Sequence, residues 1–240
     1  MKKAATGLAR LLDRLEEEYG KQALVGPSDP YEMILFVNCG YPATDGACTR
    51  GFEALKREIG TKAEKILEAS TEKLAKCTAA GGIVPEVRGE RLQTIARLVM
   101  EEFGGDLKWS LEKLIQKGKE EEPGKELRRA KKALREFPVI GEPGADKILL
   151  FAGLAPVAAV PSANVEVPQR ILFGEADKNY AKGYRAAQEA MAEELPENFE
   201  ARQGAYLLLK KHGQETCKRT KPKCEICPVK EMCAFTKENP

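Results

Sequence analysis

Apolar residues recur every three or four positions along much of the chain. In residues 6–19 this spacing marks one face of an amphipathic helix. Its apolar positions are Leu8, Leu11, Leu12, Leu15 and Tyr19. The next such segment, residues 31–40, is apolar nearly all round, which is typical of a helix in the centre of a fold. Asp29 is placed to cap that helix, with Pro30 at its first position.

Helical spacing continues over most of the remaining chain. It predicts helices at about 49–59, 61–68, 71–80, 88–103, 109–117 and 127–137. Glycines such as Gly60 and Gly104 follow these segments, and glycine is common just after the last residue of a helix. Runs of β-branched residues are short, while Ala, Leu, Glu, Lys and Arg dominate the composition. The sequence therefore predicts an all-α fold.

Composition sets the size of the core and the distribution of charge. With 240 residues, 42% of them hydrophobic, the chain can form one large domain or two small ones. A net charge of +2 does not by itself indicate a nucleic-acid partner. Between Lys210 and Pro240, however, eight Lys or Arg residues oppose four Glu, an excess of four positive charges. That end of the chain is suited to face phosphates.

The first twenty residues do not read as a targeting segment. They begin with basic residues, but Arg10, Asp13 and Arg14 interrupt the apolar run that a signal peptide needs. No run approaches the length of a membrane span. We therefore expect a cytoplasmic monomer without a membrane partner, associated with the nucleoid if its source is bacterial. The seven cysteines should then be reduced unless they bind metal.

Four cysteines lie close together in the C-terminal stretch CKRTKPKCEICPVKEMC. They are Cys217, Cys224, Cys227 and Cys233. Four thiolates this close repel one another unless a metal binds them. A structural zinc site usually shows two short-spaced pairs, but here only Cys224 and Cys227 form one, so the spacing favours an iron–sulfur cluster over zinc or unliganded cysteines. Cys39, Cys48 and Cys77 lie on helical patterns, where we expect small buried apolar residues.

The loop between the first two cysteines, KRTKPK, is strongly basic. Its cations are Lys218, Arg219, Lys221 and Lys223. A cluster that folds this loop would present them together for contact with phosphates. The alternative is a solvated loop whose charge offsets that of the cluster.

Residues 137–150, FPVIGEPGADKILL, combine an apolar entry, a turn, and a helix that opens at Glu142 and Pro143. With the cysteine spacing, this stretch resembles the endonuclease III family of DNA glycosylases, which are helix-hairpin-helix proteins with a C-terminal 4Fe–4S cluster. The resemblance implies a two-lobed all-α fold that binds damaged or distorted double-stranded DNA. It places an N-terminal helix of the cluster lobe in residues 1–28, a six-helix barrel ending in the hairpin in 29–154, and the cluster lobe in 155–240.

Most of the family's hairpin pattern is present. The matching residues are Pro138, Ile140, Gly141, Ala145, Ile148 and Leu149, and Phe137 replaces a Leu. Backbone N–H groups of such a turn bind phosphate without reading the base sequence. Val139, however, stands where the first glycine is expected, and a β-branched residue there implies a distorted or weaker grip. Gly144, one helical turn later, has no side chain and is a candidate to leave room that compensates for the bulk of Val139.

The family's catalytic positions carry other residues here. The position of the Schiff-base lysine falls on Pro143, and that of the catalytic aspartate falls on Pro161. Neither side chain can perform the corresponding step. Residues that could substitute weakly, or that are merely structural, are Glu166, Lys147, Asp146 and Ser162.

Aromatic residues and the single histidine raise separate questions. Tyr41 and Pro42 occupy the loop where the family has a Gln that fills the gap left by a flipped base, so Tyr41 is either a wedge or a residue packed on the barrel. Trp109 is expected to pack in the barrel, and His212 to cap the end of the last long helix.

Three functional hypotheses follow. The first is a DNA-binding 4Fe–4S protein that lacks efficient turnover. The second is a glycosylase that uses a displaced acid such as Glu166. The third is an interaction or redox-sensing protein that no longer contacts DNA.

Overall fold

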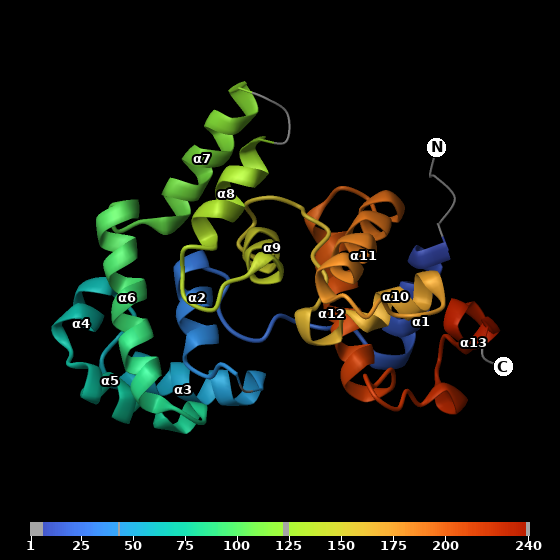
Figure 1. Cartoon of the computed structure of the whole chain (residues 1–240), viewed down its shortest axis with the longest axis horizontal. Helices are drawn as coiled ribbons and strands as arrows, with labels where there is room; N and C mark the ends of the chain where they lie inside the picture. Colours follow the sequence, from blue (N-terminus) through green and yellow to red (C-terminus); the bar gives the residue numbers. More distant parts are fainter. Residues whose placement is uncertain (1–6, 43, 122–124, 239–240) are drawn as a thin grey trace. The chain divides into compact units, whose positions relative to one another are not determined.

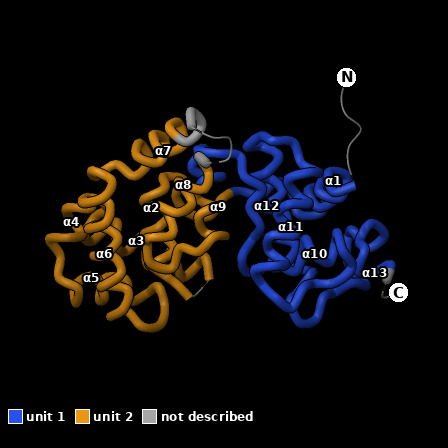
Figure 2. The backbone as a smooth tube through the Cα atoms, turned by 45° about the horizontal axis from the view of Figure 1, so that its top comes forward, with its two compact units in different colours: residues 1–23, 149–240 blue, residues 24–148 orange. Residues whose placement is uncertain are grey.

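The computed structural model describes residues 7–42, 44–121 and 125–238, and within these ranges the chain consists of α-helices, short 3-10 turns and loops, with no strand (Figure 1). The prediction of an all-α fold is confirmed. The chain forms two compact units, one of residues 24–148 and one of residues 1–23 with 149–240 (Figure 2). None of the helices in the described ranges is long and apolar enough to cross a membrane.

The unit of residues 24–148 is built around helix α2. Its helices are α2 (Pro30–Asn38), α3 (Asp45–Glu58), α4 (Ala63–Glu68), α5 (Thr71–Cys77), α6 (Pro85–Phe103), α7 (Leu107–Glu121), α8 (Lys125–Leu134) and most of α9 (Glu142–Phe151). As predicted, the Asp29 carboxylate accepts the Glu32 N–H at 3.0 Å and Pro30 opens α2. Helix α2 contacts α3, α6 and α7, and its apolar side chains are buried on several sides.

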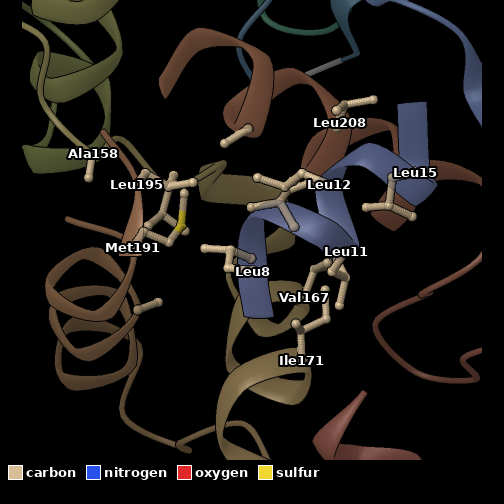
Figure 3. Close-up of a cluster of buried hydrophobic side chains, with 14 of the residues drawn as sticks. Leu8, Leu11, Leu12, Leu15, Ala158, Val167, Ile171, Met191, Leu195 and Leu208 are labelled. Carbon is tan, nitrogen blue, oxygen red and sulfur yellow. The ribbon is translucent and has the colours of Figure 1, made fainter. Parts of the chain in front are cut away.

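The other unit joins the two ends of the chain. It contains α1 (Gly7–Tyr19), α10 (Glu166–Phe173), α11 (Tyr180–Glu194), α12 (Phe199–Glu215) and α13 (Ala234–Glu238). The leucine face of α1 packs against side chains from α10, α11 and α12 (Figure 3). These are Val167, Ile171, Met191 and Leu208, with Leu195 just after α11. Burying one leucine side chain contributes roughly 1.5–3 kcal/mol to stability, so this face alone is a large part of the unit's core.

Two expectations for single residues were wrong. Trp109 is 57% exposed, because it lies on the outer face of α7, where the Lys113 ammonium stands 5.3 Å from its ring centroid. His212 does not cap the end of α12, because the helix continues to Glu215 and the imidazole is buried inside the unit. The expectation that Cys39, Cys48 and Cys77 are buried is confirmed.

Candidate nucleic-acid interface and cluster pocket

The turn between α8 and α9 adopts a left-handed conformation at Val139. The φ angle there is 59°, in the region that glycine enters readily and a β-branched residue enters at a cost. The Ile140 N–H donates to the Phe137 carbonyl at 3.2 Å, which closes the turn. Phe137 and Ile140 are both buried, so the apolar side chains of the turn point into the unit.

In the first turn of α9 the backbone is exposed, because glycine side chains do not cover it. Gly141 is exposed, and a Cβ added there would meet only the Pro143 ring, at 3.8 Å. Among the described residues of this turn, the Ala145 N–H already donates to the Gly141 carbonyl and Pro143 has no N–H, so the donors left for a ligand are the N–H groups of Gly141, Glu142 and Gly144. Such a helix N-terminus attracts anions, although the carboxylate of Glu142 works against them here.

Two buried contacts hold this turn in place. The Asn38 amide donates to the carbonyls of Ile34, at 3.0 Å, and Pro138, at 3.1 Å, which ties the turn to α2. The Lys131 ammonium lies 2.6 Å from a carboxylate oxygen of Asp146, which is fully buried, and this ion pair joins α8 to α9. The Asp146 carboxylate therefore serves the packing of the hairpin in this structure.

Tyr41 lies in the loop after α2 and is 47% exposed. The Arg91 guanidinium stands 5.9 Å from its ring centroid, which fixes the ring by a cation–π contact. Two further exposed apolar residues, Ile83 and Val84, precede α6. The two loops meet at Gly81, where a Cβ would overlap the carbonyl oxygen of Cys39. Sequence reasoning missed this pair, although the run GGIVP, with two apolar residues between breakers, was a usable signal.

The four C-terminal cysteines line one small cavity in the other unit. Burial, with a smaller contribution from charge repulsion by the neighbouring thiols, raises the pKa of Cys227 to about 11, although a backbone hydrogen bond at Val229 acts in the opposite direction. Burial also raises the pKa of Cys217, against the effect of Arg170, which lowers it. Thiolates packed this closely become favourable ligands once a cationic metal core offsets their charge.

The four cysteines supply the donor set of an iron–sulfur cluster. Across the described ranges, no three His, Cys, Asp or Glu side chains converge closely enough to hold one metal ion. Four thiols spread around a cavity are the donor set of a polynuclear iron–sulfur centre. His212 borders the cavity, with its Nε2 3.8 Å from the Cys227 sulfur and its Nδ1 2.9 Å from the Tyr19 hydroxyl, and burial lowers its pKa to about 4. It therefore stands there as a neutral imidazole.

The basic loop borders this cavity through Pro222 and Lys223. Arg219, Lys221 and Lys223 are exposed, while Lys218 is partly buried and donates to the carbonyl of Gln214. The structure thus brings the four cations of the loop next to the cysteine pocket, with three of them facing solvent.

Residues 217–233 match the model of the iron–sulfur binding domain of endonuclease III. The chain is similar to endonuclease III of Escherichia coli K12, with 23% identity over 208 residues that cover 87% of this chain and 85% of the relative. Endonuclease III of Rickettsia prowazekii is 31% identical over 106 residues, covering 43% of this chain and 46% of the relative.

Two solved structures have a similar fold. One is a trapped endonuclease III–DNA covalent intermediate, with a TM-score of 0.71 and 16% identity. The other is a thermostable thymine-DNA glycosylase, with a TM-score of 0.71 and 20% identity. Each alignment covers 96% of this chain and 95% of the other. The chain is similar to endonuclease III over most of its length. It has the fold of these solved structures, and its C-terminal cysteine segment matches the iron–sulfur domain in which a 4Fe–4S cluster is expected.

The segment after α9 carries Pro161, the second position at which the sequence predicts a replaced catalytic residue. Pro161 is buried and is followed by the exposed Ser162, whose carbonyl accepts the Tyr180 hydroxyl at 3.2 Å. Glu166 begins α10 and is only 6% exposed, and its Oε1 has no hydrogen-bond partner within the described part of the chain. Burial raises the pKa of Tyr180, and the nearby Glu166 carboxylate adds to the effect. Lys147, also considered from the sequence, is partly buried on α9.

The strain at Val139 predicts an inverted order of stability for two substitutions. In a helix, Ala is more stable than Gly by about 0.5–1 kcal/mol, but at a left-handed position an L side chain costs roughly 1–2 kcal/mol. We therefore expect Val139→Gly to be more stable than Val139→Ala by about 1 kcal/mol. The free energies of unfolding from denaturant titration give this difference.

Val87 in α6 provides the matched control, since its Gly variant should be the less stable one. If Val139→Ala proved more stable than Val139→Gly, the turn would not be left-handed in solution.

Proposed function

We propose that this protein binds damaged or distorted duplex DNA, as a monomer, through the hairpin turn at residues 137–144 and the basic loop at 218–223. We also propose that it holds a 4Fe–4S cluster on Cys217, Cys224, Cys227 and Cys233 and turns over slowly or not at all. The observation that carries DNA binding is the turn at Val139, which keeps a left-handed backbone and a bare helix N-terminus despite the loss of the glycine. The similarity to a structure described as an endonuclease III–DNA complex supports this.

The role of Tyr41 follows from its exposure. A half-exposed ring held by Arg91, next to the exposed Ile83 and Val84, is suited to insert into an unstacked base step. The hairpin and the wedge would then act together, because Asn38 ties the turn to the end of the helix that leads into the Tyr41 loop. We assign contact with phosphate to the hairpin and the basic loop, and contact with the opened step to the wedge.

Loss of chemistry is the second part of the proposal. Pro143 offers no amine to the sugar, and Pro161 offers no carboxylate to balance a cationic transition state. Exposed Ser162 carries a neutral hydroxyl, which cannot replace that charge. Binding without efficient base release is the outcome that these two residues favour.

One observation favours a second candidate function. The carboxylate of Glu166 is buried, and one of its oxygens lacks a hydrogen-bond partner in the described part of the chain. A buried unsatisfied acid lowers the stability of a fold, so its presence calls for an explanation such as a catalytic role. A glycosylase that uses Glu166 as a displaced acid would account for this. Its low exposure argues against direct contact with a substrate, so this candidate requires the surrounding segment to open.

We expect the purified protein to be yellow-brown and to contain about four iron ions and about four sulfide ions per chain. Cys224→Ala should lose most of this iron, because it removes one of the four thiolate ligands. Cys77→Ala is the control: it removes a buried cysteine of the other unit, and this variant should retain its iron. Iron analysis and the visible absorption spectrum measure both. Stoichiometric zinc in protein prepared without oxygen would contradict the assignment.

Affinity for duplex DNA should fall steeply with salt concentration, because the contacts are to phosphates. Removing Lys221 and Lys223 together should reduce the slope of log affinity against log salt by about two. The matched control removes Lys178 and Lys182, two exposed lysines outside the loop. An equal loss of slope in the control would mean that net charge, and not the loop, is responsible. No detectable binding to any duplex would favour the interaction or redox-sensing hypothesis.

Borohydride should trap no covalent adduct with abasic DNA, since residue 143 has no amine. Base release from modified duplexes should be slow, because a missing electrostatic contribution of this kind costs about 10² to 10³ in rate. Pro161→Asp should raise the rate, while Pro161→Ala, which removes the proline without adding charge, should not. Efficient base release by the unaltered protein, abolished in Glu166→Gln, would instead establish the displaced-acid candidate.

A further inference from the structure

Arg170 contacts the C-terminal segment at several points. Its Nη1 donates to the Lys218 carbonyl at 2.9 Å, and its Nη2 donates to the Arg219 carbonyl at 2.7 Å. The same Nη1 lies 3.7 Å from the sulfur of Cys217. The guanidinium also stands 5.6 Å from the ring centroid of Phe235. One side chain of α10 thus contacts a cysteine of the pocket and the backbone of the basic loop.

The geometry of these contacts requires an arginine. A guanidinium presents several N–H donors in a rigid planar fork, so it can reach two successive carbonyls and a sulfur at the same time. A lysine ammonium keeps the charge but is a single point on a flexible stem. The contact to Arg219 is made through its carbonyl, while the residue itself is exposed, so the loop can be held from its inner side with its cations outside.

The charge of Arg170 is costly unless anions surround it. Arg170 contacts the backbone of Lys218 and Arg219, two of the four cationic residues of the loop, and like charges in proximity repel. Thiolates on the inner side and DNA phosphates on the outer side would both offset this repulsion. A cation or hydrogen bond beside a cluster sulfur also raises the reduction potential of the cluster.

We propose that Arg170 is a positioning residue that couples the cluster pocket to the basic loop. Its charge stabilises the Cys217 thiolate, and its planar fork sets the backbone of the loop that would meet DNA. This inference rests on the proposed function for both the cluster and the DNA contact. It adds a residue outside the cysteine motif and assigns separate tasks to its charge and its shape.

Two variants separate these tasks. Arg170→Met keeps the length of the side chain but removes charge and donors, whereas Arg170→Lys keeps the charge and removes the fork. Arg185→Met is the matched control, because Arg185 lies on α11 and donates to the Ala181 carbonyl of its own helix. For each purified holo-protein we would measure the rate of cluster loss in air with an iron chelator, the reduction potential by voltammetry, and the affinity for duplex DNA.

Both Arg170 variants should lose the cluster faster than the unaltered protein, by about 10- to 100-fold, as is typical when a group that orients a metal ligand is removed. The reduction potential should become more negative in Arg170→Met and stay near its original value in Arg170→Lys. Affinity for DNA should fall in both, because the loop has lost its backbone anchor. Arg185→Met should match the unaltered protein in all three measurements.

A residue that only fills space would produce none of these differences. Unchanged cluster loss and potential in Arg170→Met would overturn the proposal. If Arg170→Met does not fold, the result rests on Arg170→Lys. Faster cluster loss at an unchanged reduction potential would support the proposal. A rate of cluster loss equal to that of the unaltered protein would overturn it. Failure of the proposed function would appear in the unaltered protein, as absent iron or absent DNA binding, whereas failure of this proposal appears in the differences between variants.

Discussion

The buried leucine face of α1 is the interaction on which the cluster pocket depends. Leu8, Leu11 and Leu15 are almost completely buried against helices from the other end of the chain. This packing places α10 and α12 side by side, and these helices carry Arg170 and His212 to the wall of the cysteine cavity. The loop of residues 217–233 has little regular structure of its own. A hydrophobic contact between the chain ends therefore supports a site made of polar side chains.

The hairpin follows a similar logic in the other unit. Its turn is strained at Val139, and strain of this kind persists only where surrounding contacts determine the conformation. The Asn38 amide and the buried pair of Lys131 and Asp146 supply such contacts. Pro143 and Pro161 are compatible with this framework, because neither takes part in these contacts. In the proposed function, binding and chemistry therefore rest on different parts of the chain, since backbone groups would bind phosphate while side chains would be needed to break bonds.

Sequence periodicity located most helices to within a few residues, and its errors have a common cause. Helix α3 begins at Asp45 rather than near 49, and α7 runs from Leu107 to Glu121 rather than from 109 to 117, because polar turns of a helix carry no apolar signal. Trp109 was expected to pack in the barrel, yet the face of α7 that carries it is exposed. The hydrophobic pattern shows which residues can be buried, but it does not show which of them pack against another element of the fold.

The sequence by itself determined the helical class, the set of four cysteines, the cap at Asp29, and the absence of an amine or carboxylate at positions 143 and 161. These depend on local spacing or on residue identity. Only the tertiary structure decided that Val139 takes a left-handed conformation, that Asn38 holds the turn, and that Arg170 reaches the loop of Cys217. The reason is physical: each of those features arises from contacts between segments far apart in the chain, as with Asn38 and Pro138, and local spacing carries no information about which distant atoms meet.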